Sequence, residues 1–203
     1  MLKKLLMRKY FIKFFKILFF VKRFFQTIKY LKISQLFFTI TGYLINKKIS
    51  LEKLPFRTTK KLFLKDFCWR NENIKDKKFK FLNQTKVIKK PKDWNKKKAS
   101  KLWLYNLHYF DYLNNKDNKK YKIRNRNFIH KWIKENDFKK GVGWDPYPTS
   151  LRIVNWIKWL IKNNIKDETI EKSLAVQLRW LNKNKEYRLM ANHLLANAKA
   201  LFF

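Results

Sequence analysis

Glycine and proline are scarce in this chain, and their scarcity constrains the fold more than any other feature of the sequence. The 203 residues include 3 Gly and 4 Pro, whereas Lys, Leu and Ile are abundant. Gly and Pro build the tight turns that strand-rich folds need in large numbers, so this composition favours helices. The apolar fraction of 46% supplies enough buried surface to offset the entropy of ordering. We therefore expect an ordered, all-α protein of one or two domains.

The formal net charge of +36 has two explanations. Of the 50 basic residues 9 are Arg and 41 are Lys, and Asn, Ile and Phe are also frequent. A/T-rich codons encode this set of residues, so coding bias and solvated lysine faces explain the count. Alternatively, the charge attracts a polyanion, because nucleic acid, anionic lipid and acidic polysaccharide all respond to the same field. No nucleic-acid-binding module is recognisable, and we expect no nucleic-acid partner.

The cysteine and histidine residues indicate no metal centre. Cys68 is the single cysteine, which excludes an internal disulfide and a Cys-rich zinc site. His108, His130 and His193 are too scattered in sequence to indicate metal ligation from their spacing. The chain also has no phosphate-binding glycine loop, dinucleotide fingerprint or nucleophile elbow. We expect neither a metal nor a cofactor.

Residues 1–50 contain no Asp or Glu and predict a basic amphipathic helical segment. Lysine and arginine interrupt every apolar run, so the segment fits neither a secretory signal nor a membrane span, which needs about 20 apolar residues. Its apolar residues recur at spacings that place them on one helix face: Phe14, Leu18, Val21, Phe25 and Ile28. This face either lies on anionic lipid, through residues 1–32, or packs on the rest of the protein.

The rest of the chain divides near residue 100. Residues 51–100 predict an irregular lead-in of loops and short elements around the apolar sequence FKFLNQT. Residues 101–203 predict several helices with buried apolar faces. Hydrogen-bonding aromatic residues are concentrated at the start of this second part, in LWLYNLHYFDYL (102–113). This segment either holds the core together or forms a binding surface.

The sequence GVGWDPYPTSLRIVNWIKWLI (141–161) predicts a stiff approach to a helix capped by Thr149 or Ser150. Arg152 then falls in the first turn, where a cation opposes the helix dipole. Arg152, Asn155 and Trp159 share a face, and a guanidinium, an amide and an indole suit a carboxylated sugar. The alternative is a structural arginine paired with a carboxylate such as Asp145.

Two further helices follow, the first capped by Asp167 with acidic residues in its first turn. The last helix opens at ANHLLANAKALFF, with Leu194, Ala198 and Leu201 expected on its core side. From the residues alone, Asn192 is explained as the cap of this helix. His193 in the first turn is expected to be partly exposed.

Several segments, in order, resemble the N-terminal helical domain of heparinase II/III-like polysaccharide lyases. They are LWLYNLHYFDYL, GWDPYPTSLRIVNWIKWL and ANHLLANAKAL, with FKFLNQT and QTIKYLKISQLFF resembling the lead-in. The resemblance implies an α/α toroid of helical hairpins, followed by a β-sandwich domain. It also implies β-elimination on a uronic-acid polysaccharide such as heparan sulfate or alginate, and location in the periplasm or cell envelope.

The resemblance also implies roles for particular residues. Asn192 and His193 match the family's catalytic Asn-His position, where the Asn meets the substrate carboxylate. Beside these two residues, we expect the three segments to line one sugar-binding groove with the substrate-binding residues Asn106, His108, Tyr109, Trp144, Tyr147, Arg152, Asn155 and Trp159. In the aromatic segment we expect Leu107, Phe110 and Leu113 to pack inside while Asn106, His108 and Tyr109 face the polymer.

The family's catalytic Tyr, a further His and the β-sandwich match nothing in these residues. The toroid is therefore expected to be incomplete, and the chain to be inactive alone unless a second polypeptide completes the lyase. Two alternatives remain: a non-catalytic module that binds acidic polysaccharide, and a basic peripheral-membrane or nucleic-acid binder. The polymer and the compartment are left open by the sequence.

Overall fold

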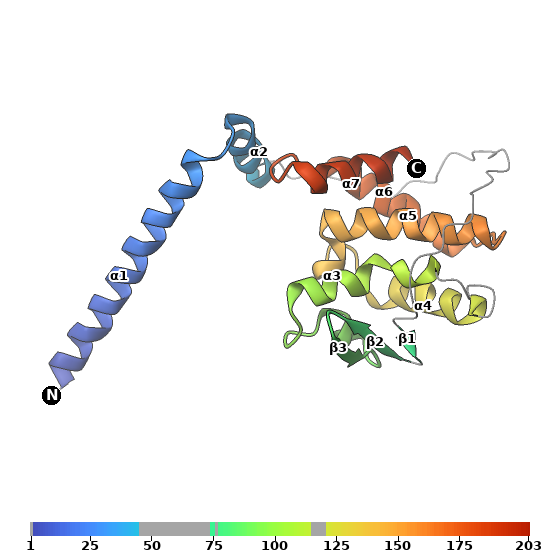
Figure 1. Ribbon diagram of the computed structural model, residues 1–203, viewed down its shortest axis with the longest axis horizontal. Coiled ribbons are helices and arrows are strands. Elements are labelled where there is room, and N and C mark those ends of the chain that lie inside the picture. Colours follow the sequence, from blue (N-terminus) through green and yellow to red (C-terminus); the bar gives the residue numbers. More distant parts are fainter. Residues whose placement is uncertain (1, 45–73, 76, 115–120) are drawn as a thin grey trace. The chain divides into compact units, whose positions relative to one another are not determined.

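The computed structural model describes residues 2–44, 74–75, 77–114 and 121–203 (Figure 1). These residues are mainly helical, which confirms the helical class, although a small sheet departs from the all-α expectation. The chain forms two compact units. The first comprises Met1–Asn46 with Tyr187–Leu189, and the second comprises Lys47–Glu186 with Met190–Phe203. Cys68 and about half of the predicted lead-in at 51–100, namely residues 51–73 and 76, lie outside the described residues.

The first unit contains two helices, α1 (Leu2–Lys29) and α2 (Ile33–Leu44). At a rise of about 1.5 Å per residue, the 28 residues of α1 span about 42 Å. The predicted basic helix is therefore present. Within the described residues, no helix has both the length and the apolarity that crossing a bilayer requires.

The first elements that the structure describes in the second unit form a three-stranded antiparallel sheet, in the order β1 (Ile74–Lys75), β2 (Lys78–Phe81) and β3 (Gln84–Val87). The FKFLNQT sequence forms the hairpin between β2 and β3, with Phe81 paired to Gln84. The two loop residues, Leu82 and Asn83, have φ of 51° and 59°, as a tight two-residue hairpin requires. Phe79 and Phe81 alternate with exposed lysines and join the core.

Five helices build the rest of the second unit: α3 (Lys101–Tyr109), α4 (Lys122–Glu135), α5 (Pro146–Lys162), α6 (Glu168–Lys183) and α7 (Ala191–Phe202). Three short 3-10 turns are also described: η1 (Pro91–Asn95) precedes α3, η2 (Asp111–Asn114) follows α3, and η3 (Val142–Trp144) precedes α5. Helix α5 contacts α3, α6 and α7. Figure 1 shows it running between α3 and α7. Because α5 is covered on several sides, few of its residues remain open to solvent.

Helix starts were predicted with mixed success. Asp167 caps α6 by accepting a hydrogen bond from the Ile170 amide at 3.2 Å, as expected. The predicted cap of α5 at Thr149 or Ser150 is wrong. Helix α5 begins earlier, at Pro146, because proline is favoured in the first helical position, where its missing N–H costs nothing.

The predicted cap of α7 at Asn192 is also wrong. Met190 is the N-cap residue and Asn192 lies exposed in the first turn. The buried residues of α7 are Asn197 and Ala200, whereas the predicted core residue Ala198 is exposed. The predicted face is therefore displaced by about one residue.

The core of the second unit is aromatic. Its largest fully buried side chains include five tryptophans: Trp94, Trp103, Trp132, Trp156 and Trp159. Phe110 stacks on Trp94 with ring centroids 6.3 Å apart and meets Trp156 edge-on at 5.3 Å. Leu107, Phe110 and Leu113 are buried, which confirms the predicted inward face of the aromatic segment.

Gly143 tests how tightly this core is packed. A Cβ added there would lie 2.6 Å from Nδ1 of His108, a ring held on both sides, so Gly143→Ala should cost about 1–3 kcal/mol of unfolding free energy. Gly42 in α2 has no atom within 4 Å of an added Cβ, so the control Gly42→Ala should be neutral or stabilising by up to about 1 kcal/mol. Urea unfolding measures both. Equal effects of the two substitutions would contradict the packing described.

Candidate functional site

Arg152 lies at the centre of the second unit and is completely buried. Its guanidinium donates to the Gly143 carbonyl at 2.7 Å, to Gln177 Oε1 at 2.8 Å and to Thr149 Oγ1 at 3.2 Å. The guanidinium carbon also lies 3.9 Å from the centroid of the Trp132 ring. Uncharged oxygens and an aromatic face therefore take the place of water around this cation.

Of the two sequence interpretations of Arg152, the polymer-binding one is wrong, and the structural one is correct except for its carboxylate partner. A buried guanidinium cannot reach a polymer at the surface, and its carboxylate partner was expected to be Asp145, which instead contacts Tyr105 and Lys101. Burial lowers the pKa of Arg152 below its ordinary value, because no water and no anion stabilises the charged form. Arg152 is thus a structural residue held by hydrogen bonds to neutral oxygens.

His108 was expected to face a ligand, and this prediction is wrong for the same reason. The ring is fully buried and both of its nitrogens are used. Nδ1 accepts from the indole N–H of Trp132 at 2.9 Å, so the proton lies on Nε2, which donates to the Trp94 carbonyl at 3.0 Å. Burial, followed by the positive charge of Arg152, lowers the pKa of His108 to about 3. His108 is therefore a neutral structural ring.

The other predicted binding residues are distributed between the core and the surface. Trp144 and Trp159 are buried, so neither presents an open ring face for a sugar. Asn106 is half-buried and donates to the Leu102 carbonyl within its own helix at 2.8 Å. The amide of Asn155 donates to the Tyr109 carbonyl at 2.9 Å and to Asp111 Oδ1 at 2.6 Å. These two amides are therefore engaged by the protein.

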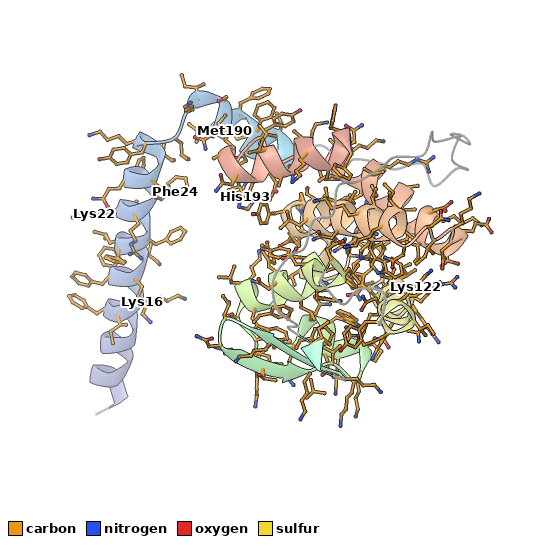
Figure 2. The ribbon with its side chains drawn as sticks, turned by 45° about the vertical axis from the view of Figure 1, so that its right-hand side comes forward. Lys16, Lys22, Phe24, Lys122, Met190 and His193 are labelled. Atoms are coloured by element: carbon orange, nitrogen blue, oxygen red, sulfur yellow. The ribbon has the colours of Figure 1, made fainter. Side chains whose placement is uncertain are left out.

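Three predicted residues do come together, and they belong to three different segments. The rings of Tyr109 on α3 and Tyr147 on α5 meet edge-on at 5.9 Å. The Tyr147 ring lies 4.4 Å from the ring of His193 on α7, at an interplanar angle of 35°. Tyr147 and His193 are partly exposed, and Figure 2 marks His193 near the start of α7. Tyr109 is buried, so the prediction that its side chain faces the polymer is wrong. We call Tyr105, Tyr109, Asp145, Tyr147, Glu186 and His193 the tyrosine–histidine cluster.

One end of the cluster is organised around Asp145. The hydroxyl of Tyr105 donates to Asp145 Oδ2, which also lies 3.0 Å from Nζ of Lys101. Burial and the neighbouring carboxylate raise the pKa of Tyr105, and burial raises the pKa of Tyr109. At neutral pH both phenols are therefore protonated, and that of Tyr105 donates to Asp145.

The other end is organised around Glu186. Its Oε1 lies 3.1 Å from Nδ1 of His193, and its Oε2 accepts from the Asn197 amide at 3.3 Å. Asn197 is completely buried and also donates to Ser150 Oγ at 2.9 Å, which fixes the carboxylate in place. With Nδ1–H donated to Glu186, a neutral His193 carries its lone pair on Nε2, the arrangement of a general base.

The backbone that leads into α7 is strained. Met190 has φ of 56° with ψ of −156°, and Ala191 has φ of 44°. Residues other than glycine rarely adopt these backbone angles, and each residue that does so costs about 1–3 kcal/mol of folding free energy. Strain of this kind persists where the surroundings impose it, and it is found preferentially at functional sites. It lies directly before Asn192 and His193.

Sequence reasoning missed four residues that hold the cluster together: Tyr105, Asp145, Glu186 and Asn197. Two signals were available. Tyr105 and Tyr109 are four residues apart and share a helix face. Glu186 is the single acidic residue after Glu171, so any cation or imidazole in the last helix had one candidate anion within this part of the chain. The role of Asn197 had no sequence signal, because a buried asparagine in an Ala-rich helix is not distinguishable from an exposed one.

The described residues contain no group of three or more His, Cys, Asp or Glu side chains that could hold a metal ion. Comparison of the chain with protein-family models, with curated proteins and with solved structures found no match. The resemblance to heparinase II/III-like lyases therefore stays a prediction, and the chemistry of the cluster must be argued from its own residues.

Removing the guanidinium of Arg152 should be strongly destabilising. Arg152→Ala removes the donor to Gln177 Oε1 and to Thr149 Oγ1, leaves the Gly143 carbonyl with the Thr149 hydroxyl alone, and opens a void beside Trp132. It should cost about 3–5 kcal/mol in urea unfolding. The exposed Lys166→Ala serves as the control and should change stability by less than about 0.5 kcal/mol. A small effect of Arg152→Ala would show that the cation is not needed by the fold.

His108 should make stability depend on pH. In the unfolded chain its pKa is about 6.5, whereas in the folded chain it is about 3. Between these pH values the unfolded chain binds one more proton than the folded chain. The contribution of His108 to the unfolding free energy is therefore complete above about pH 6.5, and it falls by about 1.4 kcal/mol for each pH unit below that. His108→Gln keeps a donor and an acceptor but cannot titrate. Unfolding free energies at several pH values should show a shallower slope for this variant, and equal slopes would contradict the assignment.

Proposed function

We propose that this chain is the N-terminal part of a heparinase II/III-like polysaccharide lyase acting on a uronic-acid polymer. One observation carries the proposal. The three segments with the resemblance, separated by about 40 residues each, bring together the buried Tyr109 and the partly exposed Tyr147 and His193. If the three segments served only to build the core, their polar aromatic residues would not need to meet at one place.

The fold is compatible with this proposal. Helices α5, α6 and α7 follow one another through short connections, as do the helical hairpins of an α/α toroid. We propose that helices α3 to α7 are the opening part of such a toroid, which further hairpins would close. The cluster, formed by α3, α5 and α7, would then lie along the groove that the polymer occupies.

The chemistry of the cluster suits β-elimination. The proton at C5 of a uronate is weakly acidic, because removing it places negative charge beside an ionised carboxylate. Donors that meet that carboxylate offset the developing charge, and we assign this task to the amide of Asn192, which is exposed. A base then takes the C5 proton, the C4–O bond breaks, and a C4–C5 double bond forms. His193, with Glu186 on Nδ1, can accept the proton at Nε2.

The aromatic residues of the cluster would position the sugar. Tyr147 offers a partly exposed ring of the kind that stacks on a pyranose face. The phenols of Tyr105 and Tyr109 stay protonated, so they donate hydrogen bonds and neither serves as a base. The proton for the leaving oxygen would come from a group outside this set.

A second candidate function is a non-catalytic module that binds acidic polysaccharide. The net charge of +36 favours it, since a polyanion is attracted without any reaction. The same cluster would serve as the binding site. The two functions are distinguished by the product, because only elimination creates the ultraviolet absorbance of an unsaturated uronate.

The test combines binding and turnover. Titration of the full chain with heparan sulfate and alginate oligosaccharides should show binding that Asn192→Ala and His193→Ala each weaken about 10-fold, as expected for loss of a charge-assisted contact. Asn182→Ala, an exposed asparagine on α6 outside the cluster, should leave binding unchanged. If the folded chain binds no uronate oligosaccharide, or all three variants behave alike, the proposal fails.

Turnover separates the two candidates. Unsaturated uronate should form when the chain is combined with the polypeptide encoded by the adjacent reading frame, and His193→Ala should abolish it. Binding without product, in the chain alone and in the combination, would favour the non-catalytic module.

A further inference from the structure

Helix α1 carries an apolar surface that is open to solvent. Phe14, Leu18, Val21 and Phe25 are all exposed. At about 100° per residue, these four side chains lie within an arc of about 60° on the helix. Their neighbours Phe11 and Phe15 contact one another at 4.9 Å and are also exposed. We call the four residues the apolar arc.

Three basic residues lie opposite the apolar arc on the same helix, together with the exposed Phe20, while Lys22 and Lys29 lie within about 70° of the centre of the arc. Lys13, Lys16 and Arg23 lie within about 80° of one another, centred about 150° from the apolar arc. Residues 1–50 contain no acidic side chain that could neutralise them. Figure 2 shows the side chains along α1, with Lys16, Lys22 and Phe24 labelled, projecting outward from the helix. The helix thus combines an exposed apolar arc with uncompensated positive charge.

This combination of exposed apolar and basic side chains indicates which kind of partner binds α1. A second copy of α1 would bring the same cations close together with no acidic residue on either helix to pair with them. Nucleic acid would satisfy the cations but leave the phenylalanines in water. An anionic bilayer satisfies both, because phosphates meet the basic side while the acyl boundary takes the apolar arc. The lysines within the helix favour an orientation in the membrane plane.

We propose that α1 binds anionic lipid surfaces as an in-plane helix, with the apolar arc (Phe14, Leu18, Val21 and Phe25) in the acyl boundary and Lys13, Lys16 and Arg23 toward the headgroups. This property is independent of the proposed lyase function. It tethers the chain to a membrane surface through its first unit and needs no residue of the tyrosine–histidine cluster.

Two substitutions on α1 test the proposal as a matched pair. Phe25 and Phe20 are both phenylalanine, with 65% and 71% exposure, but Phe25 belongs to the apolar arc and Phe20 lies on the basic side. Phe25→Asp and Phe20→Asp change the net charge by the same amount. Sedimentation of the full chain with vesicles of phosphatidylcholine, alone or with about a third phosphatidylglycerol, measures binding.

The wild-type chain should prefer the anionic vesicles by about 10-fold or more over neutral ones. Phe25→Asp should lower binding to anionic vesicles by about 10-fold or more, and Phe20→Asp by less than about 3-fold, since only the first places a charge in the acyl boundary. If both variants lost the same amount of binding, the interaction would depend on net charge alone, and the in-plane orientation would be wrong. Absence of wild-type binding to anionic vesicles would overturn the proposal altogether.

Two further measurements exclude protein as the occupant. Without lipid, circular dichroism and thermal unfolding of Phe25→Asp should match those of Phe20→Asp. A selective loss of stability in Phe25→Asp would mean that the arc packs on the rest of the chain. Self-association of the wild type that Phe25→Asp removes would mean that a second copy covers it. Either result contradicts the proposal.

Discussion

The second unit depends on one cation that water does not reach. The guanidinium of Arg152 lies against the ring of Trp132 on α4 and donates to oxygens of η3, α5 and α6. A buried charge of this kind is costly unless every donor has a partner, so the elements that supply the partners are constrained together. One side chain thus connects three helices and a turn.

The candidate site follows from that constraint. The bond from Arg152 to the Gly143 carbonyl holds the turn that leads into α5, and Gly143 in turn packs against His108 on α3. With the turn fixed, Asp145 reaches Tyr105 and Tyr147 reaches Tyr109. The buried Asn197 then joins α7 to α5 through Ser150 and holds Glu186 beside His193. The exposed cluster is therefore positioned by polar groups in the interior.

Sequence periodicity predicted which residues share a face but not how many faces of a helix are covered. The cap at Asp167 and the inward residues Leu107 and Phe110 were correct because they follow from local chemistry and from apolar character. The side chains of Arg152 and His108 were predicted to face outward because polar groups usually face solvent. Both are buried because partners from distant segments satisfy them, and sequence spacing carries no information about such partners.

The central claim is that the three segments converge at Tyr109, Tyr147 and His193. The most direct measurement is a nuclear Overhauser spectrum of the full chain with these three rings assigned. Ring centroids at 4.4 Å and 5.9 Å predict cross-peaks from Tyr147 to His193 and from Tyr147 to Tyr109. A folded chain in which neither cross-peak appears would contradict the convergence, and with it the candidate site.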